Sequence, residues 1–139
     1  MIVKFKKLTS EAVAPKQGTC GSAGFDLTAT SVFYDEDLQN VHYGSGIAVE
    51  IPEGHVGLLF PRSSIYKKGL HLTNSVGVID SDYRGEVKAV FRGSNVDLYE
   101  IGERFAQLII IPIPSVSYIE ADELSKTKRG TGGYGSTGK

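Results

Sequence analysis

The stretch GIAVEIPEGHVGLLFP, residues 46–61, consists of two short apolar runs on either side of a proline and a glycine. Each run contains β-branched side chains and is shorter than a typical helix, so each predicts a β-strand. The trio Pro52-Glu53-Gly54 between the runs has the composition of a turn. The chain is therefore expected to pass through two strands that are joined by this turn.

A second pattern supports the same fold class. In EVKAVFRG, residues 86–93, side chains alternate with the period of two that is typical of a half-buried strand. The inward positions are Val87, Ala89 and Phe91, and the outward positions are Lys88, Val90 and Arg92.

Three further segments complete the prediction. RFAQLIIIPIP, residues 104–114, predicts a strand that is buried on both faces at its centre and ended by Pro112 and Pro114. IVKFKKL, residues 2–8, predicts an edge strand, and SSIYKKG, residues 63–69, is the best place for a helical turn. With turn signals this frequent, we expect an all-β, jelly-roll-like barrel or sandwich with at most one short helix.

The composition is that of an ordinary soluble protein. With 139 residues, 40% of them hydrophobic, and a net charge of -1, the chain is expected to form no nucleic-acid or membrane surface. Its single cysteine, Cys20, cannot form an internal disulfide, which predicts a reducing compartment. No signal peptide or membrane-spanning stretch is recognisable. We expect a cytoplasmic protein, or a nuclear or organellar one if a signal was removed.

Five stretches combine glycine with polar and charged side chains where a plain β-sheet does not need them. They are GSAGFDLTA (21–29), PRSS (61–64), TNSVGVIDSDYRGE (73–86), GERFAQL (102–108) and the tail RGTGGYGSTGK (129–139). Four of the five arginines fall within them, namely Arg62, Arg84, Arg104 and Arg129. Because the guanidinium fork suits phosphate oxygens, this placement indicates a small polyanionic ligand.

Purely structural interpretations stay open for the same residues. Asp26 is compatible with a turn cap, residues 80–85 with a polar hairpin, and Gln107 with an amide that satisfies backbone groups. A glycine-rich terminus is often disordered. The three histidines lack ligand spacing and are expected to be structural or surface residues: His42, His55 and His71.

Taken in order, the five stretches resemble the five motifs of the trimeric deoxyuridine triphosphatases (dUTPases). The matching segments are AGFDL (23–27), PRSS (61–64), GVIDSDYRGEV (77–87), GERFAQLI (102–109) and RGTGGYGSTG (129–138). The resemblance implies a jelly-roll-like subunit in a homotrimer whose three active sites are each built from all three chains. It also implies hydrolysis of dUTP to dUMP and pyrophosphate with Mg²⁺, which keeps uracil out of DNA and supplies dUMP for thymidylate synthesis.

The resemblance also assigns roles to individual residues. Asp80 is implied as the general base that activates a water for attack on the α-phosphorus. Asp82, expected to face the other way along a strand-like segment, is assigned a structural role. Magnesium is implied to be held mainly by the triphosphate, with Asp26 in contact through water.

The implied substrate-binding residues fall into three groups. Phosphate contacts are assigned to Arg62, Ser63, Ser64 and Gln107. Base and sugar selection is assigned to a β-hairpin with Asn74, Gly77 and Ile79, and to Tyr83, which would stack under the deoxyribose and exclude a 2′-hydroxyl. The tail contributes Arg129, Gly133, Tyr134, Gly135 and Ser136.

The tail is interpreted as a lid. We expect a β domain, residues 1–124, that carries motifs one to four, and a flexible glycine-rich lid, residues 125–139, that carries motif five. Arg129 would reach the γ-phosphate, and Tyr134 would stack over the uracil where the family usually has phenylalanine. Residues 133–139 also match most of the phosphate-loop pattern G-x-x-x-x-G-K, but without a following Ser/Thr and helix we do not expect that kind of site.

Two alternatives remain at this point. A dCTP deaminase-like enzyme would share the fold and the triphosphate cradle, but it would need a catalytic glutamate at the base, where this sequence has DSDYRGE at residues 80–86. A non-catalytic or moonlighting nucleotide-responsive trimer would use exposed residues such as those of Val32–Tyr43 to meet a partner protein.

Overall fold

The computed structural model describes residues 1–93 and 97–136 of the chain. This part contains nine strands and one short helix. The elements are β1 (Lys4–Lys7), β2 (Phe25–Thr28), β3 (Ser31–Asp35), β4 (Asn40–Glu50), β5 (His55–Pro61), α1 (Ile65–Lys68), β6 (Leu70–Leu72), β7 (Gly77–Ile79), β8 (Glu86–Gly93) and β9 (Arg104–Pro112). The expectation of an all-β fold with at most one short helix is confirmed.

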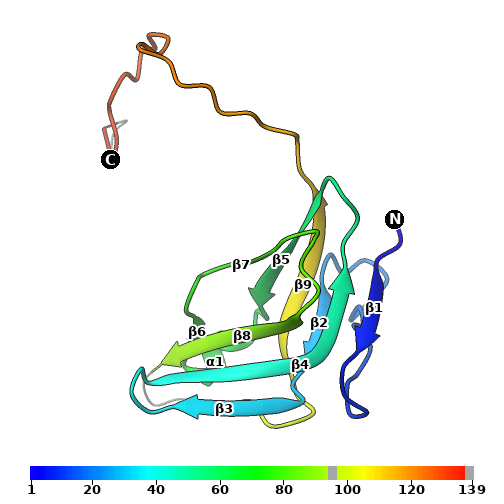
Figure 1. Cartoon of the computed structure of the whole chain (residues 1–139). Coiled ribbons are helices and arrows are strands. Elements are labelled where there is room, and N and C mark those ends of the chain that lie inside the picture. The colour runs from blue at the N-terminus through cyan, green and yellow to red at the C-terminus, as the bar shows by residue number, and fades with distance from the viewer. Residues whose placement is uncertain (94–96, 137–139) are drawn as a thin grey trace.

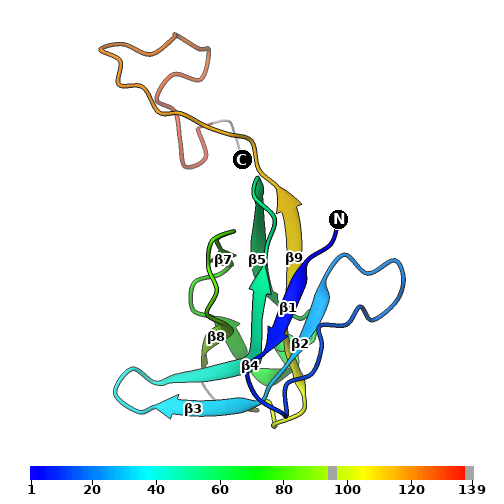
Figure 2. The same cartoon turned by 45° about the vertical axis from the view of Figure 1, so that its right-hand side comes forward.

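The strands form two antiparallel sheets (Figure 1). The five-stranded sheet has the order β1-β4-β8-β6, and β3 also pairs with β4. The four-stranded sheet has the order β2-β9-β5-β7. Figure 2 shows β1 and β3 following one another along the long strand β4, and β1 is an edge strand as the lysines predict.

The core lies between the two sheets and is rich in aromatic rings. Tyr43, Phe91 and Phe105 are fully buried, and the rings of Tyr43 and Phe105 stack with centroids 5.6 Å apart. The Tyr43 hydroxyl donates a hydrogen bond of 3.1 Å to the carbonyl of Tyr99, so its polar end is satisfied. The predicted inward positions of β8 are confirmed, because Val87 and Ala89 are buried together with Phe91.

The two strands of the opening stretch belong to different sheets. β4 lies in the five-stranded sheet and β5 in the four-stranded sheet, so the turn at residues 52–54 carries the chain from one layer to the other. Gly54 has a φ of 74°, a left-handed conformation that glycine adopts without strain. The turn was predicted correctly, but it does not close a hairpin.

A bend in β4 separates the half that pairs with β3 from the half that pairs with β1, both in the five-stranded sheet. The register with β8 is interrupted between Gly44 and Ala48, where Gly46 has a φ of 63°. The Glu86 carboxylate accepts the Gly46 N–H at 2.8 Å, which satisfies a donor that the irregular ladder leaves unpaired.

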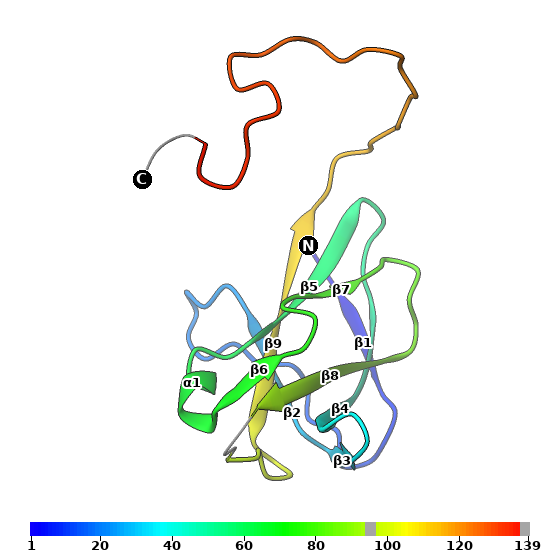
Figure 3. The same cartoon turned by 90° about the vertical axis from the view of Figure 1, so that its left-hand side faces the viewer.

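The chain leaves the sheets after β9. In Figures 1, 2 and 3 the segment after β9 extends away from the strands. In Figure 3, α1 lies next to β6 at the lower left. Side chains on the segment after β9 are exposed, including Tyr118, Ile119 and Tyr134. Gly138 and Lys139, which complete the G-x-x-x-x-G-K pattern, lie outside the described residues.

The described residues contain no helix with the length and hydropathy needed to cross a bilayer.

Candidate active site

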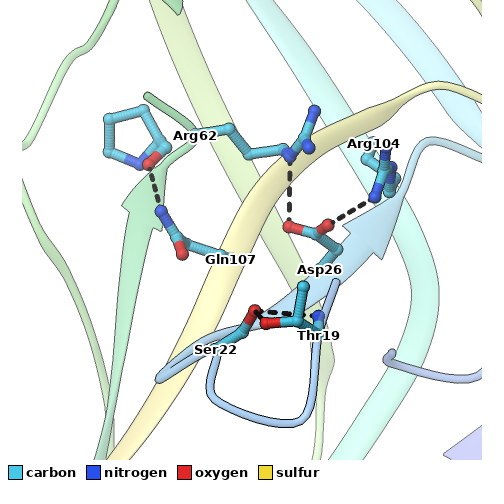
Figure 4. A network of polar contacts seen from close by, with 7 residues as sticks. Thr19, Ser22, Asp26, Arg62, Arg104 and Gln107 are labelled. Atoms are coloured by element: carbon cyan, nitrogen blue, oxygen red, sulfur yellow. Dashed lines mark hydrogen bonds and ion pairs between the residues drawn. The ribbon is translucent and has the colours of Figure 1, made fainter. Parts of the chain in front are cut away.

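An aspartate between two arginines forms the centre of the first polar cluster (Figure 4). Asp26 on β2 accepts Arg62 Nε at 3.1 Å on one carboxylate oxygen and Arg104 Nη1 at 2.9 Å on the other. The Asp26 side chain is only 12% exposed. Asp26 therefore fixes the direction of both guanidinium groups.

Arg104 was not among the predicted binding residues. The only sequence signal for it was its place in one of the arginine-containing stretches. Its contact with Asp26 arises because β2 and β9 are neighbours, with Asp26 opposite Gln107 in the register.

Gln107 holds the start of the arginine- and serine-containing segment. Its Nε2 donates to the Pro61 carbonyl at 3.0 Å (Figure 4). The amide also explains a glycine of the first motif, since a Cβ at Gly24 would be 2.5 Å from Gln107 Oε1. A side chain at position 24 would therefore push this amide away. The loop before β2 is shaped by a 3.0 Å hydrogen bond from Thr19 N–H to the Ser22 hydroxyl, also drawn in Figure 4.

The two serines follow β5 on a tight turn that leads into α1. Ile65 N–H donates to the Arg62 carbonyl at 3.0 Å, and Ser64 is the N-cap residue of α1 without a side-chain capping bond. Among residues 1–93 and 97–136, neither the Ser63 nor the Ser64 hydroxyl has a hydrogen-bond partner, and Ser63 is exposed. Both hydroxyls can therefore donate a hydrogen bond to a ligand.

A second cluster surrounds Asp80, directly after β7. Residues 80–83 form a turn in which Tyr83 N–H donates to the Asp80 carbonyl at 3.2 Å. The Tyr83 hydroxyl donates to the Glu86 carbonyl at 3.1 Å, which folds the ring back over Gly85. A depression of about 200 Å³ lies here, lined by Val78, Ile79, Asp80, Tyr83, Glu86 and Lys88.

The turn changes the interpretation of Asp82. The expectation that Asp82 faces away from Asp80 assumed an extended strand with alternating side chains. Because the segment turns, both carboxylates border a second, larger depression together with Ser81 and Arg84. Arg84 stabilises the turn by donating to the carbonyls of Ser81 and Tyr83 at 2.6 and 2.9 Å.

Asn74 and Gly77 lie on the connection between β6 and β7. β6 pairs with β8, whereas β7 pairs with β5, so this connection crosses between the sheets. The hairpin that the resemblance implied around Asn74 is therefore not a hydrogen-bonded pair of β6 and β7. Ser75, with a φ of 62°, provides the sharp change of direction, and Asn74 borders a small pocket of about 150 Å³.

The tail forms a third group that lies apart from the other two. Arg129 Nε donates to the Gly132 carbonyl at 2.8 Å, which closes a local turn. Tyr134 and its neighbours Gly133, Gly135 and Ser136 are exposed or nearly so. Figure 1 shows the described part of the tail extending away from the two sheets.

One chain does not bring the first two clusters together. Ile79 is opposite Gly57 on β5, so Asp80 lies near the beginning of β5, while Arg62 follows the end of β5. Six residues at about 3.3 Å each separate these positions by roughly 20 Å. The Asp80 carboxylate and the segment that begins at Arg62 therefore lie in separate parts of one chain.

The carboxylates of the described residues do not form a protein cage for a metal ion. Groups of three or more His, Cys, Asp or Glu side chains suited to a metal are absent from residues 1–93 and 97–136. Single carboxylates fit Mg²⁺ when phosphate oxygens and waters supply most of its ligands. Asp26 already has an arginine on each oxygen, so only its remaining lone pairs are free for a water.

Comparison with known proteins decides the family. The sequence model of the dUTPase family matches residues 10–138. The chain belongs to the dUTPase family. The match spans all five motifs, so the resemblance that they predicted is confirmed.

Curated relatives of the family align with nearly the whole chain. A deoxyuridine 5′-triphosphate nucleotidohydrolase of Hydrogenobaculum sp. is 42% identical and covers 96% of this chain and 95% of its own length. The enzyme of the same name from Escherichia phage T5 is 42% identical and covers 95% of this chain and 96% of its own length. A mitochondrial one from Dictyostelium discoideum is 40% identical, with 97% and 76% covered.

Solved structures agree on the fold. The dUTPase of Staphylococcus bacteriophage 80alpha with dUpNHpp superimposes with a TM-score of 0.81 at 27% identity, over 99% of this chain and 98% of that chain. A variant of the phage phi11 dUTPase of S. aureus, described with a structural Mg(II) ion, has a TM-score of 0.73 at 24% identity and covers 88% of this chain and 98% of that chain.

Proposed function

We propose that this chain hydrolyses dUTP to dUMP and pyrophosphate by attack of water on the α-phosphorus. The observation that carries the proposal is the near full-length similarity to relatives named deoxyuridine 5′-triphosphate nucleotidohydrolase. The chemistry of the two clusters supports it, because one supplies guanidinium and hydroxyl donors and the other an exposed carboxylate.

Asp80 is the proposed general base. Its carboxylate lies at the exposed start of a turn and borders two depressions, so a water can reach it. A carboxylate in hydrogen-bond contact with the attacking water removes its proton as the bond to phosphorus forms. Asp80 thus needs access to a triphosphate that the other cluster binds.

Arg62, Ser63, Ser64 and Gln107 are the proposed phosphate-binding residues. Donors that are aimed before the reaction stabilise the charge that develops on the leaving pyrophosphate. The free serine hydroxyls and the Arg62 guanidinium, whose direction Asp26 sets, have this character.

Asn74, Gly77, Ile79 and Tyr83 are proposed to select uracil and deoxyribose. They lie along one path from the β6–β7 connection to the turn after β7. Close packing is already present at this path, since a Cβ at Gly77 would be 3.0 Å from the Leu59 Cβ. A site with little spare room rejects an added methyl or hydroxyl group mainly by collision.

The tail from Ser125 onward is proposed as a separate lid on the β domain of residues 1–124. Arg129 would contact the γ-phosphate, Tyr134 would stack on uracil, and Gly133, Gly135 and Ser136 would approach phosphates through their backbones. Ordering such a segment costs about 1–2 kcal/mol per residue, so closure requires a ligand that compensates for it.

A homotrimer with shared sites is the proposed assembly. The roughly 20 Å between Asp80 and Arg62 of one chain supports it, because a complete site then needs the two clusters from different subunits. The segment after β9 also supports it, since Val116, Tyr118 and Ile119 are exposed apolar side chains without a place in their own sheets.

Magnesium is the proposed cofactor, held mainly by triphosphate oxygens, with Asp26 in contact through water. When bound, Mg²⁺ neutralises phosphate charge and orients the triphosphate. The chain's contribution is to aim Arg62 and the serine hydroxyls at the remaining phosphate oxygens. For the location we propose the cytoplasm, on the basis of the single exposed cysteine.

The decisive experiment measures pyrophosphate release with magnesium and each of dUTP, dTTP, dCTP and UTP. We expect release from dUTP alone, and we expect Asp80→Asn to lose most turnover while still binding dUTP. Ammonia release from dCTP would instead establish the deaminase alternative. Tight dUTP binding without turnover in the unmodified chain would establish the non-catalytic alternative.

A further inference from the structure

The segment that carries Ser63 and Ser64 is held by ion pairs at both ends, to Asp26 on β2 at its beginning and to Glu103, directly before β9, at its end. At its beginning, Arg62 pairs with Asp26, and Asp26 pairs with Arg104. At its end, Lys68 Nζ lies 3.3 Å from Glu103 Oε2. The two serines thus lie between two ion-pair clusters, which we call the first clamp (Asp26, Arg62 and Arg104) and the second clamp (Lys68, Asp97 and Glu103).

Lys68 makes all the contacts of the second clamp. Its ammonium group lies 3.2 Å from Asp97 Oδ2 and donates to the Leu98 carbonyl at 3.2 Å. It also lies 5.0 Å from the ring centroid of Tyr99, which is buried. Although it is a lysine, its side chain is only 17% exposed. These contacts fix the end of α1 to the segment that leads into β9.

The charges of this clamp are stabilised in the folded chain. Desolvation lowers the pKa of Lys68, but the bonds with Asp97 and Glu103 outweigh it and the pKa lies above its usual value. The Glu103 carboxylate accepts the Glu100 N–H and the Lys68 ammonium, and both lower its pKa. Lysine and glutamate therefore remain an ion pair over the neutral pH range.

Backbone hydrogen bonds order the residues between Arg62 and Lys68. The Arg62 and Ser64 carbonyls accept the N–H groups of Ile65 and Lys67 at 3.0 Å each, so two overlapping turns lead directly into α1. Ser64 and Lys68 are four residues apart, about one helical turn or roughly 6 Å along the axis. A shift at Lys68 is therefore transmitted directly to the serine hydroxyls.

We infer that Lys68 is a positioning residue, whose contacts with Glu103, Asp97 and Leu98 hold the Ser63 and Ser64 hydroxyls at a fixed distance from Arg62 for triphosphate binding. This inference rests on the proposed function. Lys68 itself does not touch the substrate and acts only through the turn. Because small misplacements of catalytic donors reduce rates strongly, the effect belongs to kcat more than to folding.

The test compares Lys68→Met with Lys67→Met. Lys67 is the adjacent lysine on the same turn, and its Nζ lies 5.8 Å from the ring of its neighbour Tyr66, so its replacement is the matched control. We expect Lys68→Met to lower kcat for dUTP about 10- to 100-fold, with a smaller change in KM and a fall in thermal midpoint no larger than that of Glu103→Gln at pH 7. Lys67→Met should keep kcat, and Lys68→Arg should recover most of it.

A second variant keeps the test informative if Lys68→Met folds poorly. Glu103→Gln removes one partner of the clamp, and its effect on kcat should not add to that of Lys68→Met in the double variant. An unchanged kcat in a folded Lys68→Met, or full additivity, overturns the inference. Absence of dUTP hydrolysis by the unmodified chain overturns the proposed function instead, so the two failures are distinguishable.

Discussion

Gly24 faces the side-chain amide of Gln107 so closely that a Cβ at position 24 would be 2.5 Å from Oε1 and 3.1 Å from the Gln107 Cβ. Gly24→Ala should therefore displace the amide and break its hydrogen bond to the Pro61 carbonyl. We expect a loss of about 1 kcal/mol in unfolding free energy, measured by urea denaturation, and a lower kcat/KM for dUTP.

The matched control for this prediction is Gly21→Ala, where a Cβ would meet nothing within 4 Å. Adding Gln107→Ala to Gly24→Ala should remove the collision with the amide and leave only the 3.1 Å approach to the Cβ of residue 107, so the alanine at position 24 should then cost less stability. If Gly24→Ala destabilises the chain equally with and without Gln107, the close contact is not its cause.

The sequence predicted the elements of the fold better than their partners. Alternation in residues 86–93 identified β8 and its buried face, and the lysines of residues 4–7 identified an edge strand. The turn at residues 52–54 was also predicted, but turn composition says only that the chain changes direction. Whether β4 and β5 then pair or lie in different sheets depends on contacts with β8 and β9, which are distant in sequence.

In the candidate site too, the sequence predicted the residues better than their contacts. The motifs identified Asp26, Arg62 and Gln107, but the ion pairs that join Asp26 to Arg62 and Arg104 depend on strands that are neighbours only after folding. Lys68 lacked a motif signal, because its role follows from contacts with residues 97–103. The alternation argument for Asp82 was wrong because residues 80–83 turn rather than extend.

Stability should depend mainly on the aromatic core. Phe105 is fully buried and stacks on Tyr43, so Phe105→Ala leaves a cavity between the sheets. We expect a loss of about 3–5 kcal/mol in unfolding free energy, measured by urea denaturation. The control is Phe33→Ala on the exposed face of β3, where the ring is 64% exposed and a much smaller loss is expected.

Removing the tail should separate catalysis from folding. Deletion of residues 130–139 should lower kcat/KM for dUTP while leaving the thermal midpoint nearly unchanged, because the Tyr134 side chain is fully exposed in this chain. Tyr134→Ala should weaken dUTP binding, whereas Tyr134→Phe keeps the ring for stacking and should remain active. A large fall in the thermal midpoint on deletion would contradict the proposed lid.

The separation of Arg62 and Asp80 within one chain predicts complementation between inactive variants. Arg62→Ala and Asp80→Asn should each have little activity as homotrimers. When the two are refolded together, some sites combine an intact Asp80 from one chain with an intact Arg62 from another, and part of the dUTP hydrolysis should return. Mixing either variant with itself is the control. If co-refolded mixtures stay inactive although mass measurements show mixed trimers, the two residues do not meet across subunits.

Acid should weaken the chain partly through Glu103. The Glu100 N–H and the Lys68 ammonium lower the pKa of its carboxyl group in the folded chain. A lowered folded pKa adds stability above the unfolded value of about 4.3, and this contribution is lost as the pH falls through the folded pKa. We therefore expect Glu103→Gln to reduce the thermal midpoint at pH 7 more than at pH 3.

The control for the pH experiment is Glu100→Gln, which removes a neighbouring carboxylate but keeps the backbone N–H that Glu103 accepts. Other carboxyl groups whose pKa is lowered, such as that of Glu50 paired with Lys4, contribute equally to both variants, so the comparison subtracts them. An equal drop in midpoint for Glu103→Gln at both pH values would mean that its ionised form contributes nothing specific, and that its hydrogen bonds act as neutral ones.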